Sequence, residues 1–111
     1  MPKHDMNDWP KMDKKSRKQR GRRGWADSDA WSLDTYVSRV LSELLIHLRD
    51  TTHSYPAGLT EDGWSEILTE MAQGFDRWAS RWDNDDDGTE AYDDVRRSLH
   101  LLRKWFDNLW D

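Results

Sequence analysis

Apolar residues recur at helical spacing in three separate segments of the sequence. Within each segment they follow one another at intervals of three or four residues, which is the period of one buried helical face. The stripes consist of Leu33, Val37, Leu41, Leu44 and Leu48; of Trp64, Leu68, Met71, Phe75, Trp78 and Trp82; and of Tyr92, Val95, Leu99, Leu102, Phe106 and Leu109. The pattern predicts three helices, over about residues 29–50, 60–82 and 89–110.

Polar and turn-forming residues mark the ends of these helices. Asp27-Ser28-Asp29 offers N-caps for the first helix, and Pro56 turns the chain after it. Thr60 is a natural N-cap for the second. Gly74, in the middle of that helix, costs about 1 kcal/mol relative to Ala and indicates a close backbone contact.

Three amphipathic helices joined by short polar loops favour an all-α fold, an antiparallel three-helix bundle. Leu68 and Leu99 each have apolar neighbours on both adjacent turns, so we expect them at the centre of the core. The strict seven-residue repeat of the second stripe is also typical of a coiled-coil dimer. The sequence leaves that alternative open.

Residues 1–24 lack the apolar pattern. They hold only four hydrophobic residues, and Gly21 and Gly24, together with two prolines, interrupt any long helix. We therefore predict a basic, disordered N-terminal arm over residues 1–24, followed by a helical domain over residues 25–111.

Charge separates the same two regions. The arm carries nine Lys or Arg against three Asp, a net charge of +6, whereas the domain carries eight basic against nineteen acidic residues, a net charge of −11. The whole chain is 35% charged and 35% hydrophobic. A basic arm attached to an acidic body suggests two different kinds of surface.

Several classes of function are disfavoured by the residues present. The chain has no cysteine, which excludes disulfides and thiolate metal sites, and its longest apolar run is three residues. The four histidines form no metal-binding pair, and the glycines form no phosphate loop. We expect a non-enzymatic, cytoplasmic protein without a cofactor and without a membrane segment.

One acidic loop resembles the start of a calcium-binding loop. Carboxylates at alternate positions followed by Gly88 match what a hard cation needs, and the twelfth position is also acidic. A solvated acidic loop explains the same residues without a metal. The weak candidate ligands are Asp83, Asp85, Asp87 and Asp94.

Two sets of residues are candidates for binding a partner. Cations in the arm suit a nucleic-acid backbone, because they release counterions from phosphates, or they suit a protein partner. Tryptophans outside the three stripes suit anchors of a binding site. The cations are Lys14, Lys15, Arg17, Lys18, Arg20, Arg22 and Arg23, and the tryptophans are Trp9, Trp25 and Trp110.

About half of the chain resembles a group of small, uncharacterised bacteriophage proteins from phages of Gram-positive hosts. The chain departs from their pattern at Gly63, where a Glu is common, and the resemblance ends at Phe75. It implies a phage-encoded helical protein but transfers no activity to any residue. The matching residues are GWADSDAWSLD at 24–34, HSYP at 53–56, Leu59-Thr60, WSEIL at 64–68, Met71 and Gly74-Phe75.

These observations favour a phage-encoded binding protein that inhibits or redirects a host macromolecule, such as an anti-CRISPR-type anti-defence inhibitor. Its expected partner is a host protein or ribonucleoprotein in the bacterial cytoplasm, and it would act as a monomer or small homo-oligomer. Two alternatives stay open: a nucleic-acid-associated accessory protein of phage replication or transcription, and a virion component.

Overall fold

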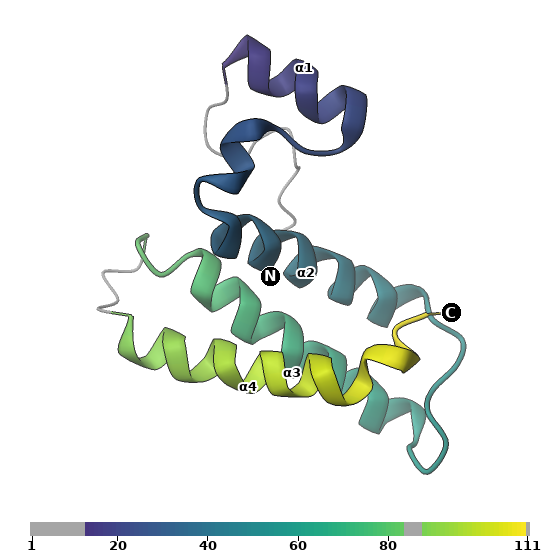
Figure 1. The fold of residues 1–111 in the computed structure, drawn as a ribbon. Coiled ribbons are helices and arrows are strands. Elements are labelled where there is room, and N and C mark those ends of the chain that lie inside the picture. Colours follow the sequence, from purple (N-terminus) through teal and green to yellow (C-terminus); the bar gives the residue numbers. More distant parts are fainter. Residues whose placement is uncertain (1–12, 84–87, 111) are drawn as a thin grey trace.

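The computed structural model describes residues 13–83 and 88–110, and within these ranges the chain is helical and contains no strand. This confirms the all-α prediction for the part described. In chain order the elements are α1 (Lys14–Arg23), η2 (Asp27–Ala30), α2 (Leu33–Thr51), α3 (Glu61–Ala79), α4 (Thr89–Trp105) and η3 (Phe106–Asn108), where η denotes a 3-10 helix (Figure 1).

The helices α2, α3 and α4 form a helical body in which consecutive helices run in opposite directions (Figure 1). Both α2 and α4 pack along α3. The predicted N-cap of α3 is confirmed, because the Gly63 N–H donates to Thr60 Oγ1 at 3.0 Å. α3 ends at Ala79 and α4 ends at Trp105, both earlier than predicted.

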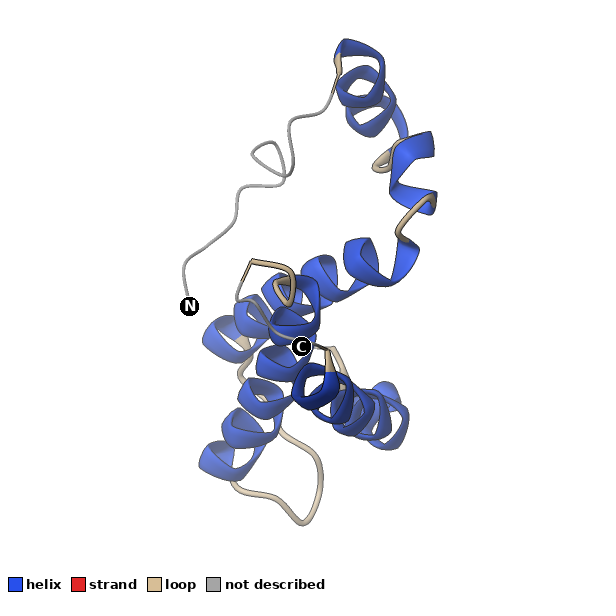
Figure 2. Cartoon of the chain, turned by 90° about the vertical axis from the view of Figure 1, so that its left-hand side faces the viewer, coloured by secondary structure: helices blue, strands red, loops and turns tan. Residues whose placement is uncertain are grey.

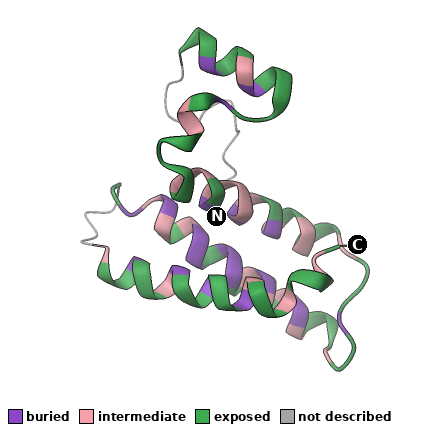
Figure 3. Cartoon of the chain, in the orientation of Figure 1, coloured by how far each residue is buried: buried purple, intermediate pink, exposed green. Residues whose placement is uncertain are grey.

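The core is built mainly by α3, where buried residues concentrate (Figure 3). Leu68 is fully buried there, as predicted. α2 contributes Leu45, and α4 contributes Val95 and Leu101. The other core members from α3 are Trp64, Met71, Ala72 and Phe75.

The predicted core face of α4 is wrong at Leu99, which is 49% exposed. Ser98 is buried in its place, directly opposite Gly74 of α3. A glycine offers no side chain to pack against, so α4 approaches α3 through its small residue and turns Leu99 outward. Leu101, on the next turn, is buried instead.

The buried face of α2 also differs from the prediction. Leu33, Val37 and Leu44 are exposed, while Ser38 and Ser42 are buried. Polar contacts orient the helix in this way: Arg49 Nη1 donates to Thr69 Oγ1 at 3.1 Å, and Arg39 donates to a carbonyl of α3 at 3.4 Å. Apolar periodicity alone does not register such contacts.

The prediction of a disordered arm does not hold for Lys14–Arg23, which forms α1. Asp13 caps the helix by accepting from the Ser16 N–H at 2.7 Å, and Gly24 ends it in the left-handed region at φ 87°. Lys, Arg and Gln are good helix formers, and contacts with η2 replace the missing apolar face. The rest of the predicted arm, residues 1–12, lies outside the described residues.

Candidate nucleic-acid interface

The helix α1 packs on η2 and stands apart from the helical body (Figures 1 and 2). Two arginines on its inner side pair with aspartates of η2: Arg20 with Asp29, and Arg23 with Asp27 at 2.5 Å. Gln19 adds a reciprocal pair of hydrogen bonds, donating to the Asp27 carboxylate at 2.9 Å and accepting from its backbone N–H at 3.0 Å. These contacts fix α1 to η2.

The pair formed by Arg20 and Asp29 is the most enclosed of these contacts. The Arg20 side chain is 8% exposed and that of Asp29 is 10% exposed. Asp29 also accepts from the Ala26 N–H at 2.7 Å. Because both charges are largely removed from water, we assign Arg20 to holding α1 in place rather than to contacting a partner.

Tyr36 joins this N-terminal unit to α2. Its hydroxyl donates to the Gly24 carbonyl at 2.9 Å, and the Arg20 guanidinium lies 5.4 Å from its ring. Burial, followed by the nearby charge of Asp29, raises the pKa of the Tyr36 phenol. The hydroxyl therefore remains a donor at neutral pH, and α1 keeps a defined position relative to α2.

The opposite side of α1 carries five exposed cations. Helical geometry places them on one broad face, because their inward-facing neighbours at 16, 19, 20 and 23 occupy the other side. Within the part of the chain that the structure describes, none of the five forms an ion pair. This cationic face consists of Lys14, Lys15, Arg17, Lys18 and Arg22.

Two aspartates that position α1 are stabilised in their ionised form. The backbone N–H of Ser16 holds the pKa of Asp13 below its usual value, and hydrogen bonds from Arg23 and Gln19 lower the pKa of Asp27. Both groups are negatively charged at neutral pH. At neutral pH, Asp13 can therefore accept the capping hydrogen bond, and Asp27 can accept from Arg23 and Gln19.

The aromatic candidates lie in different parts of the molecule. Trp25 is 48% exposed and is covered on one face by the Arg23 guanidinium, 3.8 Å from its ring. Trp110 is 66% exposed at the other end of the chain, and its Nε1–H donates to the Asp107 carbonyl at 2.9 Å. Trp9 lies outside the described residues.

Trp31 is a surface aromatic that sequence reasoning missed. It falls within the range predicted for the first helix, 29–50, but in the structure it follows η2 and is 84% exposed. The acidic residues just before it were interpreted as a helix cap, although they form the 3-10 turn. In the sequence, only the presence of Asp27 and Asp29 shortly after the arginines of α1 could have indicated a separate turn at this position.

The candidate calcium ligands are not brought together by the described residues. Asp83 is exposed, and Asp94 on α4 pairs with Arg77 at 2.9 Å. Asp85 and Asp87 lie outside the residues that the structure describes. Across residues 13–83 and 88–110, no group of three acidic or histidine side chains could hold a metal ion.

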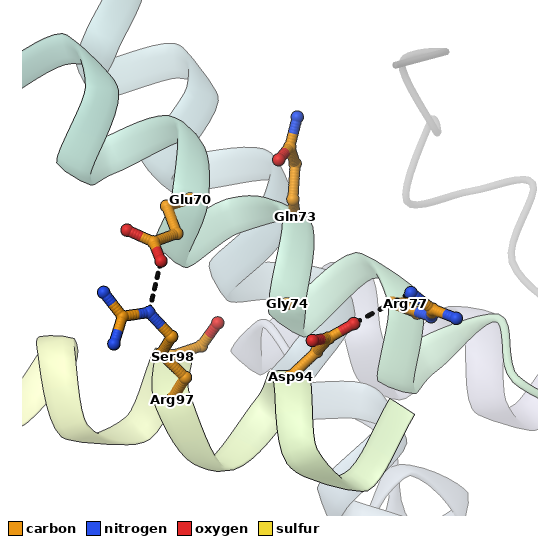
Figure 4. A pocket seen from close by; sticks show the side chains of 7 residues that line it. All are labelled: Glu70, Gln73, Gly74, Arg77, Asp94, Arg97 and Ser98. Carbon is orange, nitrogen blue, oxygen red and sulfur yellow. Dashed lines mark hydrogen bonds and ion pairs between the residues drawn. The ribbon is translucent and has the colours of Figure 1, made fainter. Parts of the chain in front are cut away.

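A polar pocket lies between α3 and α4, on the side where Gly74 meets Ser98 (Figure 4). Ion pairs span it at both ends: Glu70 with Arg97, and Arg77 with Asp94. Opposite charges therefore already neutralise each other within the pocket. We assign it to the contact between the two helices.

The described helices include none that is long and apolar enough to cross a membrane. No protein-family model, curated protein or solved structure matches this chain.

Proposed function

We propose that this protein is a non-enzymatic binding protein that contacts the phosphate backbone of a nucleic acid through the cationic face of α1. The observation that carries the proposal is the division of α1 into two sides. The two arginines on its inner side form ion pairs with aspartates of η2, while its five outer cations are exposed and make no ion pair among the described residues.

The spacing of the cationic face suits a nucleic-acid strand. From Lys14 to Arg22 the helix rises by about 12 Å, at 1.5 Å per residue. Phosphates of one strand follow at about 3.4 Å along a duplex axis, so the face spans roughly three or four of them. Binding would gain free energy by releasing the counterions condensed on those phosphates.

The charge of the rest of the molecule directs binding to α1. Residues 25–111 carry a net charge of −11 and would repel a polyanion. α1 stands away from the helical body, so a strand can reach it without lying along the acidic surface (Figure 2). Held by the pair of Arg20 and Asp29, the face is presented on a fixed helix, which reduces the ordering cost of binding.

The resemblance to small phage proteins gives this activity a setting. We place the protein in the cytoplasm of an infected bacterium, as an accessory protein of phage replication or transcription built on a compact three-helix bundle. Alternatively, the same face would contact the nucleic acid of a host ribonucleoprotein. Both roles use the same phosphate chemistry.

The proposal is tested by two variants of the full chain with equal loss of charge. One replaces three exposed cations of α1 (Lys14→Gln, Arg17→Gln, Lys18→Gln), and the control replaces three exposed cations of α4 (Arg96→Gln, Arg103→Gln, Lys104→Gln). Affinity for a labelled DNA or RNA oligonucleotide is measured by fluorescence anisotropy. We expect the α1 variant to lose at least about tenfold in affinity and the α4 variant to change little. Equal losses would reject α1 as the site.

A second candidate function is stoichiometric binding of a host protein, including inhibition of a defence complex. It is supported by an exposed face that runs along α4 to the first residue of η3 and combines aromatic and Arg residues, the types that dominate binding hot spots, with one leucine. Arg96 Nη1 donates to the Tyr92 hydroxyl at 3.1 Å, which orients two of them. This face consists of Tyr92, Arg96, Leu99, Arg103 and Phe106.

The two candidates are separated by affinity capture from host lysate with and without nuclease. Capture of one protein that survives nuclease and is lost in Phe106→Ala would support the second candidate. Capture that nuclease abolishes, together with oligonucleotide binding by the purified protein, would support the first.

A further inference from the structure

The helix α2 carries an apolar face that the described residues leave partly exposed. Leu33, Val37 and Leu44 are 56%, 40% and 58% exposed. Three further apolar residues are half-buried beside them. All six fall within an arc of about 100° on a helix that turns 100° per residue. We call this set the α2 stripe: Leu33, Val37, Val40, Leu41, Leu44 and Leu48.

The α2 stripe is set apart from the contact with α3. That contact uses Ser38, Ser42 and Leu45, together with the hydrogen bond from Arg49 to Thr69. Only Leu41 and Leu48, at the edge of the stripe, also touch the core. No charged residue lies within the stripe, so its exposure to water is unfavourable. A contiguous exposed apolar surface of this kind is typical of an interaction site.

The spacing of the stripe is self-complementary. The six residues form three pairs, and the members of each pair lie at equal distances on either side of a point between residues 40 and 41. The pairs are Leu33 with Leu48, Val37 with Leu44, and Val40 with Leu41. A second α2 placed antiparallel, with a two-fold axis at that point, therefore sets each residue against its counterpart. We propose that the α2 stripe is covered by the α2 stripe of a second copy of this chain.

The area of the stripe is sufficient for such a pairing. Together with Trp31, which lies two residues before Leu33 and is 84% exposed, the stripe exposes roughly 500–600 Å² per copy. Pairing two copies would bury up to roughly 1,000–1,200 Å² in total, which clears the minimum of about 1,000 Å² expected of a specific interface. An area of this size is typical of a weak, concentration-dependent dimer.

Charge does not oppose self-association at this face. The chain carries a net charge of −5, so two copies repel each other in general. α2 is nearly balanced, with three acidic and two basic residues, and none of them interrupts the stripe. Two copies can approach there with little repulsion. The pairing goes beyond nucleic-acid binding and does not depend on it.

Single cysteine substitutions test the pairing directly, because the chain has no cysteine of its own. About the proposed axis, two copies of residue 41 lie at nearly the same height, whereas two copies of residue 33 lie about 22 Å apart. A disulfide needs Cα atoms within about 7 Å. Leu41→Cys should therefore cross-link on oxidation, and Leu33→Cys alone should not.

Mixing two variants fixes the direction of the pairing. Leu33→Cys combined with Leu48→Cys should give a heterodimeric cross-link on a non-reducing gel. A cross-link of Leu33→Cys with itself, equal to that of Leu41→Cys, would indicate parallel helices and would overturn the proposed arrangement. Absence of any cross-link in all three samples would overturn the pairing itself.

Light scattering with matched lysine substitutions provides a second test. The wild-type chain should have twice the 13.3 kDa of one copy, and Leu44→Lys should return it to 13.3 kDa. Leu99→Lys, on an equally apolar and similarly exposed position of α4, should remain dimeric. A wild-type mass of 13.3 kDa at 100 µM, or a dimer lost only in Leu99→Lys, would contradict the proposal.

Both substituted leucines are about half exposed, so both variants should fold, as their circular dichroism would verify. Nucleic-acid binding by Leu44→Lys is measured in parallel. If monomeric Leu44→Lys retains the affinity of the wild-type chain, nucleic-acid binding does not require the pairing, and each proposal stands or falls on its own measurement.

Discussion

Gly74 and Ser98 bring α3 and α4 into direct backbone contact. A Cβ added at Gly74 would overlap the Ser98 hydroxyl and would lie 2.6 Å from the Asp94 carbonyl oxygen. This confirms the close contact that a glycine in mid-helix predicts. It also explains why Ser98 rather than Leu99 faces α3 at this point.

We therefore expect Gly74→Ala to destabilise the protein. In an open helix the substitution would gain about 1 kcal/mol. Here the methyl group meets backbone that cannot yield easily, and overpacking of this kind costs about 1–3 kcal/mol. Urea denaturation should show a lower midpoint. Gly21→Ala, with no atom within 4 Å, is the control and should not lower it.

Two Leu→Ala substitutions distinguish the observed core from the predicted one. Leu68 is fully buried and its truncation should cost about 2–5 kcal/mol. Leu99 is 49% exposed, so the same change should cost less than about 1 kcal/mol. Equal costs in chemical denaturation would contradict the orientation of α4.

The sequence predicted the helices better than their faces. Periodicity located all three helices of the body because each contains a long apolar stripe, and it identified Leu68, whereas the cap at Thr60 was predicted from its residue type. It did not give the rotation of α2 or α4, because that rotation depends on long-range polar contacts such as Arg49 with Thr69 and on the approach of α4 to Gly74.

The sequence identified the cations of the candidate site but not which of them pair with η2 and which are exposed on the other side of α1. Nothing local distinguishes Arg20 from Arg17, since both lie in one basic run. Only the position of Asp29, nine residues later, assigns Arg20 to the inside. For the same reason α1 itself was missed, because it is stabilised by charge pairs and caps rather than by an apolar face.

Removing the carboxylate of Asp29 should release α1. Asp29→Asn leaves Arg20 enclosed without its counter-ion, and losing one partner of a buried pair costs about 3–5 kcal/mol. A ten-residue helix without an apolar face has little else to offset this. Limited trypsin digestion should cut α1 faster while the body stays intact. Asp27→Asn, at an exposed pair, should have a smaller effect.

The helicity of α1 should depend on pH. The folded-state pKa values of Asp13 and Asp27 lie below their ordinary values, so their ionised forms stabilise α1 above about pH 4. That contribution is lost as the pH falls through the folded-state values. Amide chemical shifts of Lys14–Arg23 should move toward coil values on acidification. In Asp13→Ala, shifts at neutral pH should already be displaced in that direction, and an unchanged α1 would contradict the capping role.

The salt dependence of oligonucleotide binding tests the role of the cationic face most directly. If the outer cations of α1 neutralise phosphates, the logarithm of the association constant should fall linearly with the logarithm of salt concentration, by about 0.7–0.9 per phosphate contacted. Lys14→Gln, Arg17→Gln and Lys18→Gln together should reduce that slope by roughly 2–3, while the matched α4 variant should keep the wild-type slope. A slope that is unchanged in the α1 variant, with its fold intact, would contradict binding through α1.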